Sequence, residues 1–426
     1  MADERTFVIV GASLTGAKAA ETLRSEGFTG KVILIGDEDD RPYERPGLSK
    51  GYLQGKDDRE KAYVHEPDWY AAHDVALLTG TAVTAVDPLA HTVTLSSSSV
   101  ESSSAGSSLG YDKLLLATGA VPRVLPVPGA DLHGVRYLRR LGESEAIRDA
   151  FSAGGTVVVI GAGWIGLEAA AAARGFGATV TVVEVDELPL RRVLGDEVAS
   201  VYAALHRAHG VDLRFGARTA QLRGQDGTVT GVVLADGTEL PADLVVVGVG
   251  IRPLTDLAEA AGLTVDNGVV TDSALRTSDP DIYAAGDVAS IDNPLLGTHV
   301  RVEHGANALN GGPAAARSML GQDVVYDRVP YFYSDQYDAG MEYSGYVEPG
   351  GYDRVVFRGD PSVKDGKAPE FLAFWVKDGR VLAGMNVNIW DVTDDVQKLV
   401  RAGYGGRAVD LERLADPKVP LGDLLG

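Results

Sequence analysis

The amino-acid sequence predicts an α/β protein with two Rossmann-like dinucleotide-binding domains and a smaller C-terminal α+β domain. A glycine-containing turn between a strand and a helix occurs at residues 11–16 and again at residues 161–166. Each copy continues into a second strand and then into a strand–hairpin–strand stretch that ends in glycine. From Tyr326 onward the pattern changes to alternating aromatic residues, which favours an antiparallel sheet. The chain therefore contains an internal repeat followed by an unrelated region.

The first copy reads as a βαβ unit. We expect a strand over Thr6 to Val10, a helix over Ala17 to Glu26, and a second strand in "KVILIGDE". The Ser-rich stretch from Ser96 to Ser108 further along this half has no apolar period, and we expect a solvated hairpin tip there.

The glycine turn of the first copy departs from the dinucleotide motif at one position. Gly11 and Gly16 supply the first and third glycines, whereas Ser13 replaces the second, so that a bound pyrophosphate must shift slightly or accept a hydrogen bond from the serine hydroxyl. Asp37, about 20 residues further on, is the expected ribose ligand, with Glu38 as the alternative. The "GASLTG" turn is not a hydrolase nucleophile elbow, because that motif needs glycine at the position of Thr15.

The second copy matches the motif fully. Gly161, Gly163 and Gly166 follow the strand "TVVVIG" and precede a helix expected over Leu167 to Arg174. Glu184 lies about 20 residues beyond, at the end of the next strand, where a carboxylate binds ribose hydroxyls. The helix N-terminus suits a pyrophosphate.

Composition excludes several classes of function. The formal net charge of −21 disfavours nucleic acid and anionic membrane surfaces as partners. The 426 residues include no cysteine, which excludes disulfides, thiolate metal sites and a dithiol relay. The histidines have no metal-ligand spacing, so no metal site is predicted. The N-terminus lacks the pattern of a signal peptide and glycines interrupt the uncharged run from Ala150 to Leu167, so we expect a cytoplasmic protein that does not enter the membrane.

Two dinucleotide sites in one chain indicate hydride chemistry. One site can hold a fixed cofactor and the other an exchanging one. A nicotinamide delivers two electrons as hydride, and a flavin accepts them together and releases them singly.

Motifs along nearly the entire chain support this interpretation: "PYERPGLSKGYL", "YDKLLLATGAVPR", "GAGWIGLE", "GVGIRPLTDLAEAAGL", "DIYAAGDVA", "PYFYSDQYD" and "AGMNVNIWDV". Together they resemble the bacterial FAD-dependent, NADH-linked ferredoxin reductases, with apoptosis-inducing factor as a more distant relative. The resemblance implies a glutathione-reductase-like fold. Its expected domains are an FAD-binding domain at residues 1–119 and 249–327, an NADH-binding domain at 120–248, and a C-terminal α+β domain at 328–426.

The resemblance also implies two sets of cofactor ligands. The expected FAD contacts are Gly11, Ser13, Thr15, Gly16, Asp37, Arg45, Lys50, Val83, Thr118, Gly119, Arg136, Asp287 and Gly305. The expected NADH contacts are Gly161, Gly163, Ile165, Gly166, Glu184 and Gly250.

Lys50 and Glu168 are the expected catalytic residues. By the resemblance, Lys50 places a cation beside the flavin edge where negative charge builds up on reduction, and Glu168 orients it. From its position alone, Glu168 is equally well explained as a charge favoured by the helix dipole.

Coenzyme preference depends on Glu184, whose carboxylate favours the ribose diol of NADH and repels a 2'-phosphate. NADPH remains the alternative because Arg191 and Arg192 lie close by in sequence.

The resemblance names a [2Fe-2S] ferredoxin as the electron acceptor, which in turn supplies a P450 or a Rieske-type oxygenase. The alternatives are an NADH oxidase or small-quinone reductase of the same fold, and a redox-sensing flavin-dependent interaction protein. Gly305 and Tyr333 replace tryptophans common in relatives, and Gly47 replaces a proline ahead of Lys50, so acceptor choice stays open. Candidate basic residues for ferredoxin docking are Arg301, Arg317, Arg328, Lys398, Arg401 and Arg407.

Overall fold

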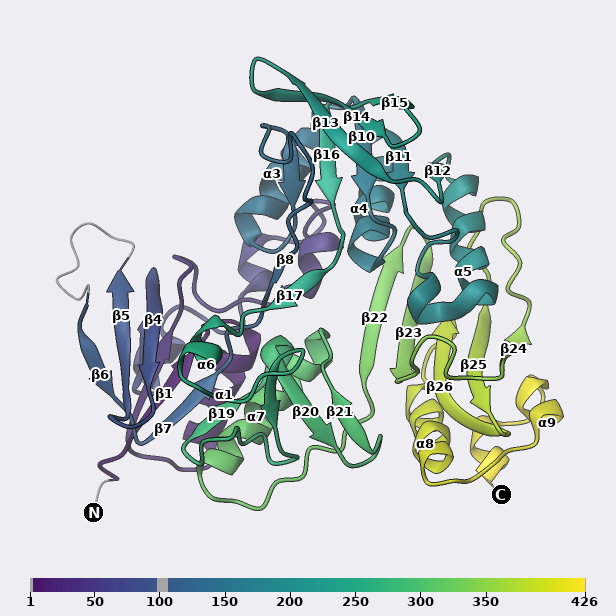
Figure 1. Cartoon of the computed structure of the whole chain (residues 1–426). Coiled ribbons are helices and arrows are strands. Elements are labelled where there is room, and N and C mark those ends of the chain that lie inside the picture. Colours follow the sequence, from purple (N-terminus) through teal and green to yellow (C-terminus); the bar gives the residue numbers. More distant parts are fainter. Residues whose placement is uncertain (1–2, 98–105, 426) are drawn as a thin grey trace. The chain divides into compact units, whose positions relative to one another are not determined.

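The computed structural model describes residues 3–97 and 106–425 (Figure 1). The chain forms two compact units, each assembled from three segments. Unit 1 comprises Met1–Arg45, Arg59–Val121 and Arg252–Pro330, and unit 2 comprises Pro46–Asp58, Pro122–Ile251 and Tyr331–Gly426. The middle of the expected Ser-rich hairpin tip, residues 98–105, lies outside the described residues. The domain limits expected from the sequence remain a prediction.

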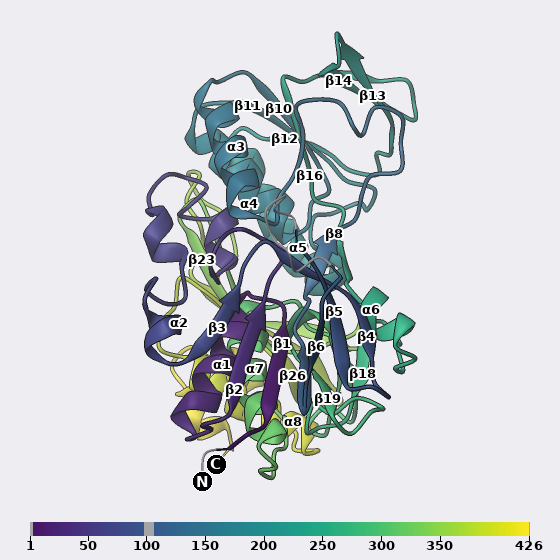
Figure 2. The ribbon, with the colours of Figure 1, turned by 90° about the vertical axis from the view of Figure 1, so that its left-hand side faces the viewer.

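Unit 1 is built on a five-stranded parallel sheet in the order β19-β7-β1-β2-β3. Figure 2 shows β1, β2 and β3 side by side. The strands are β1 (Thr6–Val10), β2 (Lys31–Ile35), β3 (Val75–Leu78), β7 (Lys113–Leu116) and β19 (Ile282–Ala284). Their apolar, β-branched residues are buried, as expected for a parallel sheet covered on its faces.

Two helices of unit 1 pack closely against each other: α1 (Leu14–Ser25) and α7 (Gly305–Met319). A Cβ atom at Gly312 would overlap the carbonyl oxygen of Thr15, so glycine permits this approach. The other elements of unit 1 are η2 (Arg59–Ala62), α2 (Trp69–Ala72), β4 (Thr81–Asp87), β5 (Thr92–Ser97), β6 (Ser108–Gly110), α6 (Asp256–Ala260), β18 (Val269–Thr271), η3 (Gly286–Val288), β20 (Ala289–Asn293) and β21 (Thr298–Val300). Strands β8 (Ala120–Pro122) and β17 (Ile251–Pro253) contain the points where the chain passes between the units.

Unit 2 contains a second five-stranded parallel sheet, in the order β12-β11-β10-β16-β9. Its strands are β9 (Val135–Tyr137), β10 (Thr156–Ile160), β11 (Thr179–Val183), β12 (Asp212–Arg214) and β16 (Leu244–Val247). The helical elements around it are η1 (Pro46–Ser49), α3 (Leu141–Ser152), α4 (Trp164–Gly175) and α5 (Arg191–Ala208), and β13 (Thr219–Gln225), β14 (Thr228–Leu234) and β15 (Glu239–Pro241) form a small antiparallel sheet. The alanine run of α4 has high helix propensity and small side chains, which allow close packing. The residues of α4 from Gly166 to Ala173 are buried.

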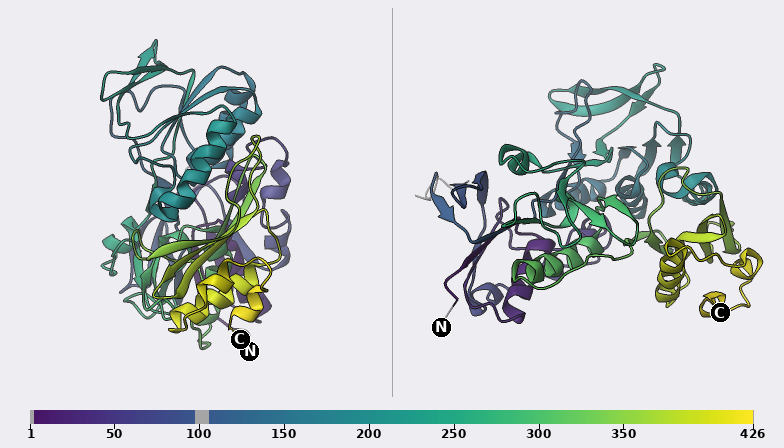
Figure 3. Two further views of the ribbon diagram at one scale, coloured as in Figure 1. Left: turned by 90° about the vertical axis from the view of Figure 1, so that its right-hand side faces the viewer. Right: turned by 60° about the horizontal axis from the view of Figure 1, so that its bottom comes forward.

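The C-terminal part of unit 2 is an antiparallel sheet in the order β22-β23-β26-β25-β24. Its elements are β22 (Tyr331–Gln336), β23 (Ala339–Gly345), β24 (Arg354–Gly359), β25 (Phe371–Lys377), β26 (Arg380–Val387), α8 (Thr393–Tyr404), α9 (Leu411–Ala415) and η4 (Leu421–Leu425). Figure 3 shows the yellow helix α8 lying against this sheet. Asp378 and Gly379 form the turn that joins β25 to β26.

The two larger sheets of unit 2 share one hydrophobic core. Buried Phe371 and Trp375 of β25 belong to the same apolar cluster as Leu167 of α4 and Leu194 of α5. The indole N–H of Trp375 donates to the backbone oxygen of Leu194 at 3.1 Å. The C-terminal region is therefore fused by packing to the half that carries the second glycine turn.

Several element ends differ from the sequence-based expectations. Helix α1 begins at Leu14 rather than Ala17, and α4 begins at Trp164 rather than Leu167. Both helices start within their glycine turns because the third glycine has no side chain. A Cβ atom at Gly16 would overlap the carbonyl oxygen of Gly11. Strand β2 ends at Ile35, before the last residues of the expected strand "KVILIGDE". The C-terminal antiparallel sheet begins at Tyr331 rather than at Tyr326.

Within the two described ranges, every helix falls short of the length and apolar character that a membrane crossing requires.

Candidate active site

The first glycine turn lies directly against the end of β7. Gly11 has φ 120°, a left-handed conformation that favours glycine, and a Cβ atom there would overlap the carbonyl oxygen of Ala117. Thr118 and Gly119 follow immediately, and the Thr118 hydroxyl donates to the backbone oxygen of Leu254 at 2.8 Å. The structure thus brings together two segments that are about 100 residues apart, both expected from the resemblance to contact FAD.

The same turn also meets the segment that contains Asp287. A Cβ atom at Gly286 would lie 2.5 Å from the hydroxyl oxygen of Thr15, so η3 is packed against the start of α1. Gly305 begins α7, directly after His304. Burial lowers the pKa of His304 to about 4, and the negative charge of Asp287 opposes this shift only in part. His304 is therefore neutral at pH 7.

Arg45 is held in a polar cluster beside this turn. Its guanidinium contacts a Glu38 carboxylate oxygen at 2.7 Å and the Tyr43 hydroxyl at 2.8 Å, and the Tyr43 hydroxyl donates to Glu38 at 2.6 Å. The Ser13 hydroxyl lies 3.5 Å from the backbone oxygen of Tyr43. Asp37 is exposed, whereas Glu38 is partly buried and engaged by two donors. Of the two acidic candidates, Asp37 is thus the one that faces solvent.

The remaining expected FAD ligands are divided between the units. Val83 lies on β4 of unit 1. Arg136 lies on β9 and Lys50 follows η1, both in unit 2. The roles of these residues remain predictions.

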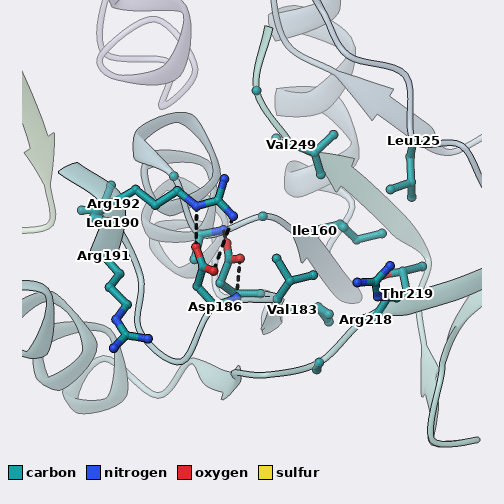
Figure 4. A pocket seen from close by; sticks show the side chains of 18 of the residues that line it. Leu125, Ile160, Val183, Asp186, Leu190, Arg191, Arg192, Arg218, Thr219 and Val249 are labelled. Carbon is teal, nitrogen blue, oxygen red and sulfur yellow. Dashed lines mark hydrogen bonds and ion pairs between the residues drawn. The ribbon is translucent and has the colours of Figure 1, made fainter. Parts of the chain in front are cut away.

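The second glycine turn opens onto a cavity of about 660 Å³ within unit 2 (Figure 4). The cavity is lined by segments that follow β10, β11 and β16, including Gly161, Gly163, Glu184 and Gly250. Ligand sites in open parallel sheets lie at these carboxyl ends of the strands. The position and size of the cavity therefore suit a dinucleotide.

The three glycines of this turn have different steric surroundings. Gly161 has φ 101°, and a Cβ atom there would overlap the carbonyl oxygen of Gly248. A Cβ atom at Gly166 would overlap the carbonyl oxygen of Gly161, so this glycine is needed for packing between helix and strand. Among the described residues, by contrast, no atom lies within 4 Å of a Cβ position at Gly163. The space in front of Gly163 is open to a ligand. Ile165, in the first turn of α4, is 41 % exposed.

Glu184 is fixed by backbone hydrogen bonds. Its carboxylate accepts from the amide of Ala162 at 2.7 Å and from the amide of Asp186 at 2.9 Å. A carboxylate has further lone pairs, which stay available for the hydroxyls of a ribose.

The two arginines considered as ligands for a 2'-phosphate are engaged by acidic neighbours. Arg192 contacts Asp186 at 2.9 Å, as Figure 4 shows, and Arg191 contacts Asp196 at 2.6 Å. Figure 4 also shows Arg218 beside Thr219 at the opposite wall of the pocket. The sequence did not single out Arg218, because it lies far from the glycine motif.

Lys50 and Glu168 form an ion pair within unit 2. The Lys50 ammonium nitrogen lies 2.9 Å from Oε1 of Glu168 and 3.0 Å from Oε2. The side chain of Glu168 is 1 % exposed and that of Lys50 is 11 % exposed. The hydroxyl of Ser49 donates to Oε2, and that of Ser334 donates to Oε1 at 2.6 Å. The dipole-only interpretation of Glu168 is thus incomplete, because the carboxylate is the centre of a buried polar network.

Two residues of β22, Tyr333 and Asp335, lie near the Lys50 ammonium group. The Lys50 ammonium lies 5.1 Å from the ring centroid of Tyr333, within the range of a cation–π interaction. Burial raises the pKa of Asp335, although the positive charges of Lys50 and Lys56 act in the opposite direction.

Several of the basic residues considered for docking are paired with carboxylates. Arg317 contacts Glu26 at 2.8 Å, Lys398 contacts Asp395 at 2.7 Å, and Arg301 contacts Glu303. They lie in both units, and the structure does not assign them to one surface patch.

The fold and these two turns define a two-dinucleotide oxidoreductase. Comparison with known proteins agrees: residues 5–312 match the pyridine nucleotide-disulphide oxidoreductase family, and residues 331–425 match the reductase C-terminal family. The chain belongs to the pyridine nucleotide-disulphide oxidoreductases, and the proteins to which it is similar include ferredoxin reductases. It is 41 % identical to putidaredoxin reductase of Pseudomonas putida, over 89 % of this chain and 88 % of the relative. It is 38 % identical to the ferredoxin–NAD(+) reductase component of the anthranilate 1,2-dioxygenase system of Burkholderia cepacia, over 97 % and 98 %.

Solved structures give the same result. The reductase in a covalent putidaredoxin reductase–putidaredoxin complex matches with a TM-score of 0.90 and 38 % identity, over 99 % of this chain and 98 % of that one. The expected fold class, with two dinucleotide-binding halves and a C-terminal α+β region, is confirmed.

Proposed function

We propose that this protein is an NADH-dependent ferredoxin reductase that contains FAD. When bound, FAD supplies the chemistry that joins a two-electron donor, NADH, to a one-electron acceptor, a [2Fe-2S] ferredoxin. The observation that carries the proposal is the presence of two separate glycine turns, each at the carboxyl end of a parallel strand, in a chain without cysteine. Electrons therefore leave to an external acceptor without a dithiol relay.

The first turn is proposed to hold FAD. Gly11 and Gly16 keep side chains away from the start of α1, whose free backbone N–H groups suit a pyrophosphate. Arg45 adds a positive charge, and Asp287 adds an acceptor for a sugar hydroxyl. These assignments, together with the other expected FAD ligands and the domain limits, rest on the resemblance and on the convergence of these segments in unit 1.

The second turn is proposed to hold NADH. Glu184 is oriented by the amides of Ala162 and Asp186, and its remaining lone pairs suit a ribose diol. A 2'-phosphate would meet this carboxylate, while Arg191 and Arg192 are occupied by their own acidic partners. These contacts favour NADH over NADPH.

Lys50 and Glu168 are proposed to act at the flavin. The ammonium group of Lys50 offers positive charge where negative charge develops during reduction. Glu168 holds this ammonium in place by contacts from both carboxylate oxygens. Neither residue is required to transfer a proton.

The proposed acceptor is a small ferredoxin that serves a P450 or a Rieske-type oxygenase, in the cytoplasm. The names of the relatives support this acceptor, because one is part of a dioxygenase system and another was crystallised with its ferredoxin partner. The net charge of −21 requires the docking surface to be locally basic if the ferredoxin is acidic.

Stopped-flow mixing of the FAD-loaded protein with NADH tests this proposal. We expect rapid loss of flavin absorbance, followed by reduction of a [2Fe-2S] ferredoxin at a rate well above that of oxygen or a small quinone. Slow bleaching with a persistent charge-transfer band would instead indicate the interaction protein. Fast bleaching with oxygen or quinone as the best acceptor would indicate the oxidase or quinone reductase.

A further inference from the structure

A series of buried hydrogen bonds leads from Glu168 through Ser334 and Gln336 to His206. Ser334 contacts Glu168 at 2.6 Å, and the Gln336 amide nitrogen lies 3.2 Å from the Ser334 hydroxyl. The Gln336 oxygen lies 2.8 Å from Nε2 of His206, and Nδ1 of His206 lies 3.0 Å from the Tyr337 hydroxyl. All these residues belong to unit 2.

The ionised carboxylate of Glu168 determines which group donates and which accepts in every hydrogen bond of this series. An ionised Glu168 only accepts, so Ser334 donates its single hydroxyl proton to it. Ser334 must then accept from Gln336, which places the amide N–H₂ of Gln336 on that side and its oxygen toward His206. His206 consequently carries its proton on Nε2.

The last step of the series agrees with this assignment. With its proton on Nε2, His206 presents Nδ1 as an acceptor, and the Tyr337 hydroxyl is a donor at the matching distance. Burial also lowers the pKa of His206 to about 4, so the ring is neutral at pH 7. The donors therefore all point toward Glu168.

Because these residues are buried, the loss of one hydrogen-bond partner affects the other hydrogen bonds of the series. Ser334 and Gln336 are 1 % exposed, and His206 is 0 % exposed. Water is thus a poor substitute for a missing partner, and an unsatisfied buried amide has a substantial free-energy cost. Loss of His206 Nε2–H would leave the Gln336 oxygen without its donor, and the amide would then be free to rotate away from Ser334.

We propose that Gln336 and His206 are positioning residues that fix the Ser334 proton on Glu168 and thereby hold Glu168 and Lys50 in one arrangement. This inference rests on the proposed role of Lys50 at the flavin. Neither residue lines the cavity of the second glycine turn. Helix α5 and strand β22 thus act on the reaction through a carboxylate that is 166 residues distant from Ser334 in sequence.

Two substitutions of His206 separate positioning from packing. His206→Gln keeps an N–H donor at the position of Nε2, whereas His206→Leu removes it. In FAD-loaded protein mixed with NADH, we expect His206→Leu to lower the limiting rate of flavin reduction about tenfold, the effect of one hydrogen bond to a charged group. The dissociation constant of NADH should change less than about twofold, since the cavity for NADH is lined by other residues. His206→Gln should recover most of the rate.

Tyr202→Phe is the matched control. Tyr202 lies on the same helix, and its buried hydroxyl has no hydrogen-bond partner among the described residues. Its removal should leave the rate unchanged. If His206→Leu does not fold, Gln336→Met provides the test, because it keeps about the size of the side chain and removes the N–H donor without adding a charge. This variant should also lower the limiting rate of flavin reduction about tenfold.

A second measurement does not depend on turnover. In the oxidised, FAD-loaded protein labelled with ¹⁵N-histidine, the His206 ring should show one fixed Nε2–H tautomer at neutral pH, assigned by its absence in His206→Gln. Exchanging tautomers in the wild type would overturn the proposal, as would equal rates in His206→Gln and His206→Leu. If the wild type is not reduced by NADH at all, the proposed function fails, while the tautomer still reports on the series itself.

Discussion

Replacing Lys50 by methionine should destabilise the protein because it leaves the Glu168 carboxylate buried without its counter-ion. Glu168 is 1 % exposed and its oxygens lie 2.9 and 3.0 Å from the Lys50 nitrogen. Removing one partner of such a pair typically costs about 3 to 5 kcal/mol. The hydroxyls of Ser49 and Ser334 still donate to the carboxylate and offset part of this loss, about 1 kcal/mol or slightly more in total. We therefore expect a loss of about 2 to 4 kcal/mol in the free energy of unfolding of unit 2.

The assay is urea unfolding of the FAD-loaded protein followed by tryptophan fluorescence, with Trp164 and Trp375 as reporters within unit 2. Glu168→Gln and the double variant Lys50→Met/Glu168→Gln complete a double-mutant cycle. The double variant should be more stable than Lys50→Met by about 1 to 2 kcal/mol, since it contains no unpaired charge. If the two changes are simply additive, Lys50 and Glu168 are not energetically coupled, and the reasoning is refuted.

Further predictions concern the second glycine turn and the acceptor. Gly163→Ala should fold normally, within about 0.5 kcal/mol of wild type, yet bind NADH more weakly in a fluorescence titration, because a Cβ atom there meets no described atom and projects into open space. Gly166→Ala should lower the melting temperature, because its Cβ atom would overlap the carbonyl oxygen of Gly161; equal melting temperatures for the two variants would contradict this distinction. Glu184→Ala should reduce the ratio of kcat/KM for NADH over NADPH by about tenfold or more, and an unchanged ratio would remove Glu184 from coenzyme selection. The rate of ferredoxin reduction should fall with increasing salt if docking is electrostatic, and a salt-independent rate would argue against a charged docking surface.

The sequence was sufficient to predict the parts of the site whose signals are local. Gly161, Gly163 and Gly166 follow a β-branched strand; packing requires glycine at Gly161 and Gly166, and the space in front of Gly163 is open. Glu184 lies about 20 residues beyond this turn in the sequence. Its carboxylate is oriented by the backbone amide of Ala162, a residue of the turn. In such a unit the strand, turn and helix are neighbours in sequence as well as in space.

Other parts of the site depend on contacts between distant segments, for which one sequence has no signal. Ser334, Gln336 and His206 are ordinary polar residues in their own segments, and only the packing of β22 against α4 and α5 joins them to Glu168. Likewise, spacing alone left Arg191 and Arg192 as possible phosphate ligands, although their guanidinium groups contact Asp196 and Asp186. The helix starts were placed three residues late because propensity disfavours glycine within a helix, whereas packing against the strand requires it.

The apolar cluster that joins the C-terminal sheet to the helices after the second glycine turn limits how reductases of this type can be recombined. An exchange of residues 331–425 alone would set a foreign β25 against Leu194 and its neighbours and leave cavities or overlaps in an interior that both parts must fill. A chimera that takes both the C-terminal sheet and helices α4 and α5 from the same parent keeps that interior intact. The C-terminal sheet would thus be exchanged only together with the cavity of the second glycine turn.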